Sequence, residues 1–390
     1  MDTEEVLVTK LIEMTIEKGV SFFTQFLKKS KSSLDLSIST ITTGSTIHIK
    51  KSYNFARSIS VYKLNDKLDL IENSIQLKIG NQDRRFYSRS QEKSLEEIDL
   101  LLDQNHHIIL GDPGAGKTTT LKRLVNKFYQ IIFSDKSEIT RYTFPIVVRL
   151  SEIKIEENLL IHLCHQLGIL YEANRKEIPY TETEDVYEDY FDHKLKENIT
   201  RKRQIKKDKV TIIYEYKIGN YPLKFGLSEY LDNMNCILFF DGLDEINYQL
   251  KETVFNEIKD LSNTLRNSKI ILTARYLQEI PSFKQFNVNE IKPLDNNQKK
   301  EIARLWLRET ELFFKKLNLL PYKDIADRPL FLTFLLRLFN VNNDELPEQA
   351  VDVYRQIILL AIREWDYDKE QDIRRYSKYK SLFKFCSINV

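Results

Sequence analysis

Residues 111–118 read Gly-Asp-Pro-Gly-Ala-Gly-Lys-Thr, and this stretch is the starting point for working out the rest of the fold. The chain has 390 residues but only 10 glycines, and three of them lie here. Glycine is used where backbone geometry or a close approach forbids a side chain. The stretch follows the apolar run Ile108–Leu110 and opens an amphipathic helix with Leu121, Leu124 and Phe128 on one side. A glycine-rich turn between a buried strand and a helix predicts a phosphate-binding loop.

The loop residues have distinct expected tasks. Consecutive backbone N–H groups and the N-terminus of the following helix form a cradle for phosphate oxygens. Lys117 is expected to reach the β- and γ-phosphates, and the hydroxyl of Thr118 is expected to bind Mg²⁺. The predicted nucleotide-binding residues of the loop are Gly111, Asp112, Pro113, Gly114, Ala115, Gly116, Lys117, Thr118 and Thr119.

A second strand ends in acidic residues. The apolar run Cys236–Phe240 leads directly into Asp241, and Asp244 and Glu245 follow shortly after it. A carboxylate at the end of a buried strand is the second half of a P-loop NTPase site, where Asp241 would hold Mg²⁺ through water. A further carboxylate can orient the attacking water. Spacing alone does not separate the two candidates, so Glu245 is the first choice and Asp244 the second.

A third strand ends in a basic residue. The run Lys269–Thr273 is followed by Ala274 and Arg275. An arginine at the tip of the strand beside the acidic one can contact the γ-phosphate and sense its presence. The residues predicted to act on the nucleotide are Lys117, Asp244, Glu245 and Arg275 in catalysis, with Thr118 and Asp241 at the metal ion.

Strand and helix patterns alternate after residue 107. The expected buried strands lie at 108–110, 144–150, 236–240 and 269–273, with a weaker fifth at 286–291, and a helix is expected at 159–167. Continuous apolar strands are typical of a parallel sheet that is covered on both faces. The pattern predicts a three-layer α/β core. After residue 293 the periodicity is helical, at 295–316, 328–341 and 348–366, and indicates an all-helical subdomain.

The N-terminal residues carry two different patterns. Residues 5–29 have the periodicity of an amphipathic helix. Residues 35–65 alternate in the manner of β-strands, with Thr43-Gly44 as the expected hairpin turn. A short helix is expected at 95–102. Together these patterns predict a small N-terminal α+β region.

Residues 171–222 interrupt the alternation of strands and helices and are interpreted as an insertion. They contain an acidic block at 182–188 and a basic run at 201–207. The basic run could bind nucleic acid, but pairing with the acidic block within the insertion is the favoured interpretation. The nucleic-acid alternative is left open.

The composition limits which partners and which cellular compartment are expected. The formal net charge is +2, so no global field draws the chain to nucleic acid or to an anionic membrane. Three cysteines are too few for a disulfide framework and suit a reducing compartment. No apolar run approaches the roughly 18 residues of a membrane-spanning helix. The first residues are acidic where a signal peptide would be basic. A cytoplasmic protein without a membrane partner is expected.

Three motifs together carry a family resemblance. The loop at 111–119, the sequence Phe-Phe-Asp-Gly-Leu-Asp-Glu at 239–245 and Leu-Thr-Ala-Arg-Tyr at 272–276 resemble a NACHT domain. This domain is the NTPase module of the STAND class of signalling ATPases, which includes bacterial antiphage proteins and animal innate immune sensors. Residues 327–333 resemble the helical segment whose proline, here Pro329, packs near the adenine. Residues 346–366 resemble the helix that closes the module.

The resemblance covers roughly residues 90–370 and implies a division of the chain. Residues 1–90 form the N-terminal region of unknown role, 91–292 the NACHT core with the insertion, and 293–390 the helical subdomain. In the family, a winged-helix domain and a large sensor region follow, where this sequence ends at Val390. A fragment, or a shortened member whose target recognition lies elsewhere, is therefore expected.

The resemblance also implies a function. The expected protein is a switch that binds ATP or ADP with Mg²⁺, hydrolyses ATP slowly and changes its assembly state with the nucleotide, in antiviral defence or stress signalling. Expected partners are further copies of the chain on activation and a trigger or effector protein that the residues do not identify. Preference for ATP over GTP rests on the resemblance. Two alternatives stay open: an AAA+-like remodelling ATPase, and a scaffold that nucleotide only stabilises.

Overall fold

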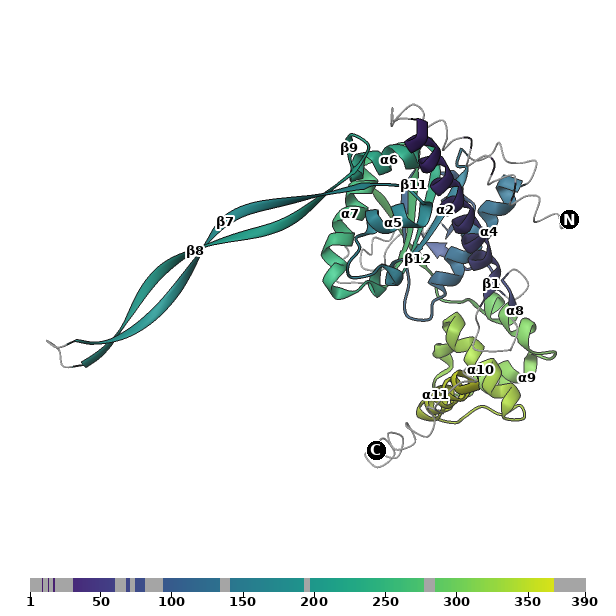
Figure 1. The fold of residues 1–390 in the computed structure, drawn as a ribbon. Helices are drawn as coiled ribbons and strands as arrows, with labels where there is room; N and C mark the ends of the chain where they lie inside the picture. The colour runs from purple at the N-terminus through teal and green to yellow at the C-terminus, as the bar shows by residue number, and fades with distance from the viewer. Residues whose placement is uncertain are drawn as a thin grey trace.

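The computed structural model describes residues 31–59, 68–70, 74–80, 94–133, 141–192, 197–276 and 285–367, together with residues 9, 13 and 17. Its centre is a seven-stranded sheet (Figure 1). The strands of this sheet are β3 (Ile79–Gly80), β4 (Ser94–Leu95), β5 (His106–Leu110), β6 (Phe144–Arg149), β10 (Cys236–Asp241), β11 (Lys269–Ala274) and β12 (Phe286–Ile291).

The strand order is β4-β3-β12-β5-β11-β10-β6. The five strands from β12 to β6 are parallel, and β3 and β4 extend one edge in antiparallel fashion. Every residue of β5, β10 and β11 is buried, as continuous apolar strands of a covered parallel sheet require. The predicted α/β core with a mostly parallel sheet is confirmed.

Helices cover both faces of the sheet (Figure 1). On one side, α4 (Lys117–Phe133) packs on β10 and β11, with α2 (Lys31–Arg57) beside it. On the other side, α6 (Leu223–Asn233) and α7 (Lys251–Thr264) pack together, and α5 (Leu159–Leu167) contacts α2, α6 and α7. Shorter elements are α3 (Asp99–Leu102) and the 3-10 turns η2 (Leu150–Glu152), η3 (Leu243–Glu245) and η4 (Tyr248–Leu250).

A helical segment follows the sheet. It consists of α8 (Asn296–Trp306), α9 (Glu311–Leu317), the 3-10 turn η5 (Lys323–Asp327), α10 (Pro329–Val341) and α11 (Ala350–Tyr367). The single helix expected at 295–316 is wrong, because the chain leaves helical geometry after Trp306. Leu307, which follows the last residue of α8, has extended backbone angles and is buried. Within the described residues, no helix is long and apolar enough to cross a membrane.

The β-strands expected at 35–65 are a wrong prediction. Residues 31–57 form the single helix α2, and Thr43-Gly44 lies in its middle rather than in a hairpin turn. Gly44 crosses the end of α5 so closely that a Cβ there would lie 2.4 Å from the backbone nitrogen of Gly168. Glycine is therefore placed for helix packing here, and not for a turn.

The error has a physical reason. The buried residues of α2 recur at helical spacing, and they are Ser37, Ile41, Ser45, His48, Ile49, Ser52 and Ala56. Because four of them are serine or histidine, the sequence shows no continuous apolar stripe. The β-branched residues between them imitate a strand. Hydroxyl groups such as that of Thr42, which donates to the carbonyl of Ile38, are satisfied within the helix.

The other N-terminal expectations have mixed outcomes. The helix expected at 5–29 lies outside the described residues except for Thr9, Glu13 and Glu17, which are helical. The helix expected at 95–102 is reduced to α3, because Ser94–Leu95 forms β4. The remaining strands, β1 (Ser58–Ile59) and β2 (Leu68–Asp69), pair with each other.

Residues 172–192 and 197–218 pair as two long antiparallel strands that project from the core (Figure 1). Its strands are β7 (Glu172–Asp192) and β8 (Glu197–Ile218), and the short β9 (Tyr221–Pro222) pairs with the base of β8. The acidic and basic blocks pair across this hairpin, as expected, through the ion pairs Lys207–Glu184 and Lys202–Asp185. Lys209, just beyond the basic run, pairs with Glu182.

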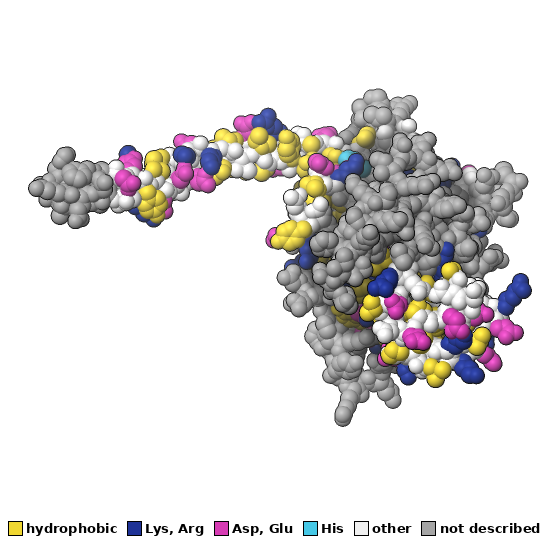
Figure 2. Space-filling view, turned by 90° about the horizontal axis from the view of Figure 1, so that it is seen from below, with side chains coloured by type: hydrophobic (Ala, Val, Ile, Leu, Met, Phe, Trp, Pro, Cys, Tyr) yellow, Lys and Arg dark blue, Asp and Glu magenta, His cyan; other side chains and the backbone are white. Residues whose placement is uncertain are grey.

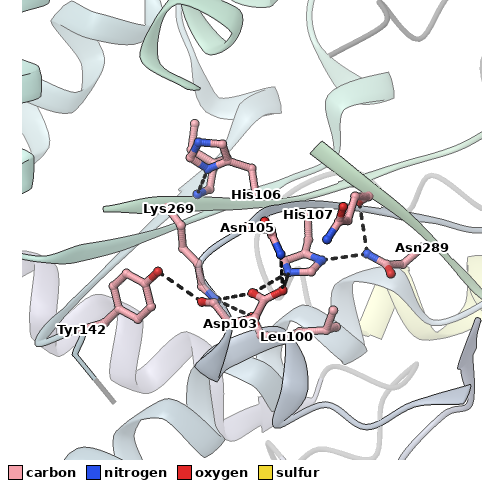
Figure 3. A network of polar contacts seen from close by, with 10 residues as sticks. Leu100, Asp103, Asn105, His106, His107, Tyr142, Lys269 and Asn289 are labelled. Atoms are coloured by element: carbon pink, nitrogen blue, oxygen red, sulfur yellow. Dashed lines mark hydrogen bonds and ion pairs between the residues drawn. The ribbon is translucent and has the colours of Figure 1, made fainter. Parts of the chain in front are cut away.

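A buried lysine joins the elements at the amino end of the parallel strands (Figure 3). The ammonium group of Lys269 donates to the carbonyls of Leu100 and Asp103, at 2.7 and 2.8 Å, and to the Asp103 carboxylate at 3.1 Å. The same carboxylate lies 2.8 Å from Nε2 of His107. Because all three protons of the buried ammonium group have acceptors, the network fastens α3 to β5 and β11.

The charges of this network shift both pKa values. Burial lowers the pKa of Lys269 to about 8, against the opposing effect of Asp103. For Asp103, partial burial favours the neutral carboxyl group, but the hydrogen bond and charge of His107 and the charge of Lys269 outweigh it and lower the pKa to about 2.

We expect Asp103→Asn to lower the free energy of unfolding by about 1–3 kcal/mol at neutral pH, because it removes the counter-charge of a buried ammonium group. Since the folded-state pKa of Asp103 lies below its ordinary value of 3.8, this contribution is complete above about pH 4 and is lost as the pH falls toward 2. Urea unfolding at a series of pH values measures it. Asp352→Asn, which removes an exposed pair with Arg355, is the control. A difference from wild type that is unchanged down to pH 2 contradicts the assignment.

Candidate functional site

The glycine-rich loop lies at the carboxyl end of β5, at the start of α4. Gly114 and Gly116 have φ angles of +77° and +91°, which side chains other than glycine rarely adopt. Ala115 is buried between them, and Thr119 lies in the first turn of α4. The loop therefore turns sharply from strand to helix, and the glycines leave its backbone open to contact. Phosphate oxygens need this geometry to accept hydrogen bonds from backbone N–H groups.

Lys117 lies against the loop that precedes it. Its ammonium group donates to the carbonyl oxygens of Gly111 at 3.0 Å and Asp112 at 3.3 Å. Burial lowers the pKa of Lys117, and the nearby charge of Asp244 opposes this. The cation is thus held on the side of the site where the acidic residues lie.

Asp241 is a buried carboxylate at the end of β10, with 7% of its surface exposed. Its Oδ1 accepts hydrogen bonds from the hydroxyls of Thr118 at 3.1 Å and Thr273 at 2.8 Å. The Thr273 hydroxyl in turn accepts from the backbone N–H of Gly242 at 2.9 Å. The carboxylate therefore connects the first turn of α4 to β11.

The oxygen atoms of Thr118 and Asp241 fit a magnesium ion. Mg²⁺ takes oxygen ligands and keeps several waters, so a hydroxyl and one carboxylate beside a phosphate site suffice. When bound with a nucleotide, the ion neutralises charge on the phosphate oxygens. Among the described residues, no group of three or more His, Cys, Asp or Glu side chains forms an all-protein metal site.

Asp244 and Arg275 form a close pair. Oδ1 of Asp244 accepts from the backbone N–H of Arg275 at 2.9 Å, and its Oδ2 lies 2.8 Å from the guanidinium Nε. The Asp244 side chain is 5% exposed, whereas half of the Arg275 side chain is exposed. Since β11 lies between β5 and β10, Arg275 is presented between the loop and the acidic strand.

Glu245 differs from Asp244 in its surroundings. It is exposed, and its carboxyl group lies beside Gly242, where an added Cβ would be 3.1 Å from Cδ of Glu245. Gly242 has a φ of +78°, so glycine both permits the turn and leaves room for the acid. Because Asp244 is bonded to Arg275, Glu245 stays the first candidate for orienting a water molecule.

The helical segment contacts the loop directly. The backbone N–H of Leu330 donates to the carbonyl of Gly114 at 3.2 Å, and the guanidinium of Arg328 lies 3.2 Å from the Asp112 carboxylate. Pro329 stands at the first position of α10, beside Gly116. Proline there also suits helix initiation, since its missing N–H would have no partner in the helix.

A cavity of about 200 Å³ lies between the loop and this segment. Its apolar lining is Ala115, Ile291, Pro293 and Pro329, and its polar lining is Asp112, Tyr276, Lys292, Asp324, Asp327 and Arg328. The apolar part of this lining lies next to the phosphate-binding loop, where a purine base would find an apolar surface. The structure thus places Pro329 in the wall of this cavity.

The structure brings the sequence-predicted residues to one edge of the sheet, with Pro113 in the loop itself. Three participants were missed. The sequence predicts no role for Thr273 or for Arg328, and the N–H of Leu330 is a backbone group that no sequence pattern reports. Of the three, only Arg328 could have been predicted from the sequence. It stands next to the predicted site residue Pro329, and arginine is a common partner of carboxylates and phosphates.

A phosphate-binding loop between a buried strand and a helix, with a buried acid at the end of a second parallel strand, defines a P-loop NTPase. The family model of the NACHT domain matches residues 105–310, more than half of the chain. The chain belongs to the NACHT family, and it is a nucleotide-binding P-loop NTPase of the STAND type. A search of curated proteins found no match.

We expect Lys117→Ala to weaken nucleotide binding by about 30-fold or more, because it removes a partly buried cation from the phosphate cradle. Titration calorimetry with ADP and Mg²⁺ measures the change. Lys127→Ala, on the same helix α4, is the matched control and should bind as wild type does. Equal affinity in the Lys117 variant would show that the loop does not hold phosphate through this side chain.

The two acidic candidates can be separated by amide substitution. We expect Glu245→Gln to keep nucleotide affinity and to slow ATP hydrolysis about 10²- to 10⁴-fold, as the loss of a general base does. Asp244→Asn should have a smaller effect on hydrolysis and should release Arg275. Phosphate release under single-turnover conditions distinguishes them. The opposite order of effects would transfer the water-orienting role to Asp244.

Proposed function

We propose that the protein is an ATP-dependent molecular switch: it binds ATP with Mg²⁺, hydrolyses it slowly, and changes its assembly state with the bound nucleotide. The observation that carries this proposal is the direct contact between the loop and the helical segment, through Gly114 with Leu330 and Asp112 with Arg328. Nucleotide phosphates would bind to the same loop that holds the segment.

The contact offers a route from nucleotide to conformation. A ligand shifts an equilibrium only by binding one arrangement better than another. Phosphates add negative charge beside Asp112, so Arg328 gains a second anionic partner when the loop is filled. The base would lie in the cavity whose wall includes Pro329. The position of α10 relative to the sheet would thus depend on the nucleotide.

Slow turnover is supported by the Asp244–Arg275 pair. The γ-phosphate of ATP is the expected partner of Arg275, yet its guanidinium is already bonded to Asp244 at 2.8 Å. Arg275 would have to exchange partners before it could stabilise charge on the transferred phosphate. A step of this kind can limit the rate of an NTPase.

The biological setting is proposed from the family resemblance. Antiviral or stress signalling in the cytoplasm, further copies of the chain as partners on activation, and a trigger protein of unknown identity complete the proposal. Mg²⁺ and adenine nucleotides are the proposed cofactors.

We expect protein purified without added nucleotide to release a stoichiometric amount of ADP on denaturation, since a switch at rest retains its product. Chromatography of the supernatant identifies the nucleotide, and Lys117→Ala is the empty control. An empty wild-type site together with turnover well above about 1 s⁻¹ would favour a remodelling ATPase and contradict the switch. Bound nucleotide without hydrolysis or change of assembly would favour the scaffold.

A further inference from the structure

A second cavity lies within the helical segment, between the start of α8, the end of α9 and the 3-10 turn η5. Its volume is about 400 Å³, against about 200 Å³ for the cavity beside the phosphate-binding loop. Sites for small molecules usually have volumes of roughly 300–1,000 Å³. Most of the side chains that line the larger cavity are exposed, so a ligand could enter it from solvent.

Three lysines line the larger cavity, which we call the lysine cavity. Lys299 pairs with the carboxylate of Asp327. Within the described ranges, the ammonium groups of Lys300 and Lys323 have neither a hydrogen-bond partner nor an ion-pair partner. The helical segment is not basic overall, since Figure 2 shows basic, acidic and apolar side chains mixed over its described surface. Two unpaired cations that line one cavity attract an anion to that place.

The rest of the lining suits a planar ring. Leu317 is buried, and the half-buried ring of Phe314 lies beside it in the wall. Aromatic side chains stack on nucleobases of every kind. The amides of Asn296 and Asn318 also line the cavity, and neither side chain has a hydrogen-bond partner among the residues that the structure describes. An amide donates and accepts at once, as the edge of a nucleobase requires.

Asp324 lines both cavities. Its carboxylate has no hydrogen-bond or ion-pair partner in the described part of the chain. A carboxylate next to a nucleotide site is a common acceptor for ribose hydroxyls. An inorganic phosphate would occupy little of the lysine cavity and would leave the ring, the amides and this carboxylate unused. A larger ligand with an anionic end, hydroxyl groups and a planar ring matches the whole lining.

We propose that the lysine cavity binds a nucleoside monophosphate as a regulatory ligand. Lys300 and Lys323 receive the phosphate, Asp324 accepts hydrogen bonds from the ribose, and the base lies against Phe314 with its edge toward the amides. The ligand enters a cavity different from the one that the proposed function assigns to the base of ATP. The site therefore does not depend on the proposed function, whereas its regulatory role rests on it.

The wall between the two cavities connects this ligand to the nucleotide. Asp327 lines the cavity beside the loop and holds Lys299, which lines the lysine cavity. The next residue, Arg328, lies 3.2 Å from the carboxylate of Asp112 in the loop. A phosphate that draws Lys299 away from Asp327 would thus change the residue that precedes the contact with the loop. Such coupling is reciprocal, so the nucleotide would change the affinity of the monophosphate by the same factor.

The first test measures binding to the lysine cavity alone. The full chain is saturated with ADP and Mg²⁺, so that the loop is filled, and is titrated with AMP, GMP, CMP and UMP in a calorimeter. At least one of the four should bind with a Kd below about 1 mM. The variant Lys300→Glu, Lys323→Glu should bind it at least about 30-fold more weakly, because like charges repel. Retained ADP binding shows that the variant is folded.

The matched control is Lys315→Glu, which alters an exposed lysine of α9 outside the cavity and should bind as wild type does. Wild-type protein that binds none of the four monophosphates overturns the proposal. Equal affinity in the variant Lys300→Glu, Lys323→Glu overturns it as well.

The second test separates a nucleoside monophosphate from other sources of phosphate. Phe314→Leu keeps an apolar side chain but removes the ring. It should weaken binding of the preferred monophosphate about tenfold and leave binding of ribose 5-phosphate unchanged. Wild-type protein that binds inorganic phosphate or ribose 5-phosphate as tightly as the best monophosphate overturns the assignment of the ligand.

The third test concerns regulation. The affinity for the preferred monophosphate should differ at least about fivefold between protein filled with ADP and protein filled with a non-hydrolysable ATP analogue. Lys299→Met removes the link to Asp327 and should bring this ratio close to one. Equal affinity in both nucleotide states of wild type contradicts the regulatory role. Monophosphate binding by a protein whose assembly never changes with nucleotide would support the site and contradict the switch.

Discussion

The hydrogen bonds to Asp241 constrain the arrangement of the whole nucleotide site. A carboxylate buried at the end of β10 has to be paired, because an unpaired buried charge is costly. Its partners are Thr118 from the first turn of α4 and Thr273 from β11. The loop, the acidic strand and the arginine strand therefore keep one relative position. Each other functional group is placed with reference to this junction.

The strand order determines where the other charged groups of the site lie. β11 separates β5 from β10, so the residue after its end lies between the phosphate loop and the acids. Arg275 reaches Asp244 from there, while Arg328 approaches Asp112 from the helical segment. Two guanidinium groups thus belong to the site, and each is paired with one carboxylate.

Much of this arrangement could be predicted from the sequence, because most strands of the core contain a continuous apolar run and the loop residues have no other common use. The carboxyl ends of parallel strands meet at one edge, so Asp241 and Arg275 could be placed near the loop. The helix α2 could not be predicted, since serine and histidine occupy four of its buried positions: Ser37, Ser45, His48 and Ser52. The contact between Leu330 and Gly114 joins backbone groups far apart in the chain, and patterns of side chains do not report it.

The base of the hairpin has a consequence for how this protein can vary. The chain leaves the core at Glu172 and returns at Lys217, and these two residues are paired neighbours. Removing or adding equal numbers of residues on both strands, two at a time, would preserve register and facing while leaving the core untouched. The distance that the hairpin extends from the core can therefore change in steps of roughly 7 Å, by evolution or by engineering, without a change in the NTPase core.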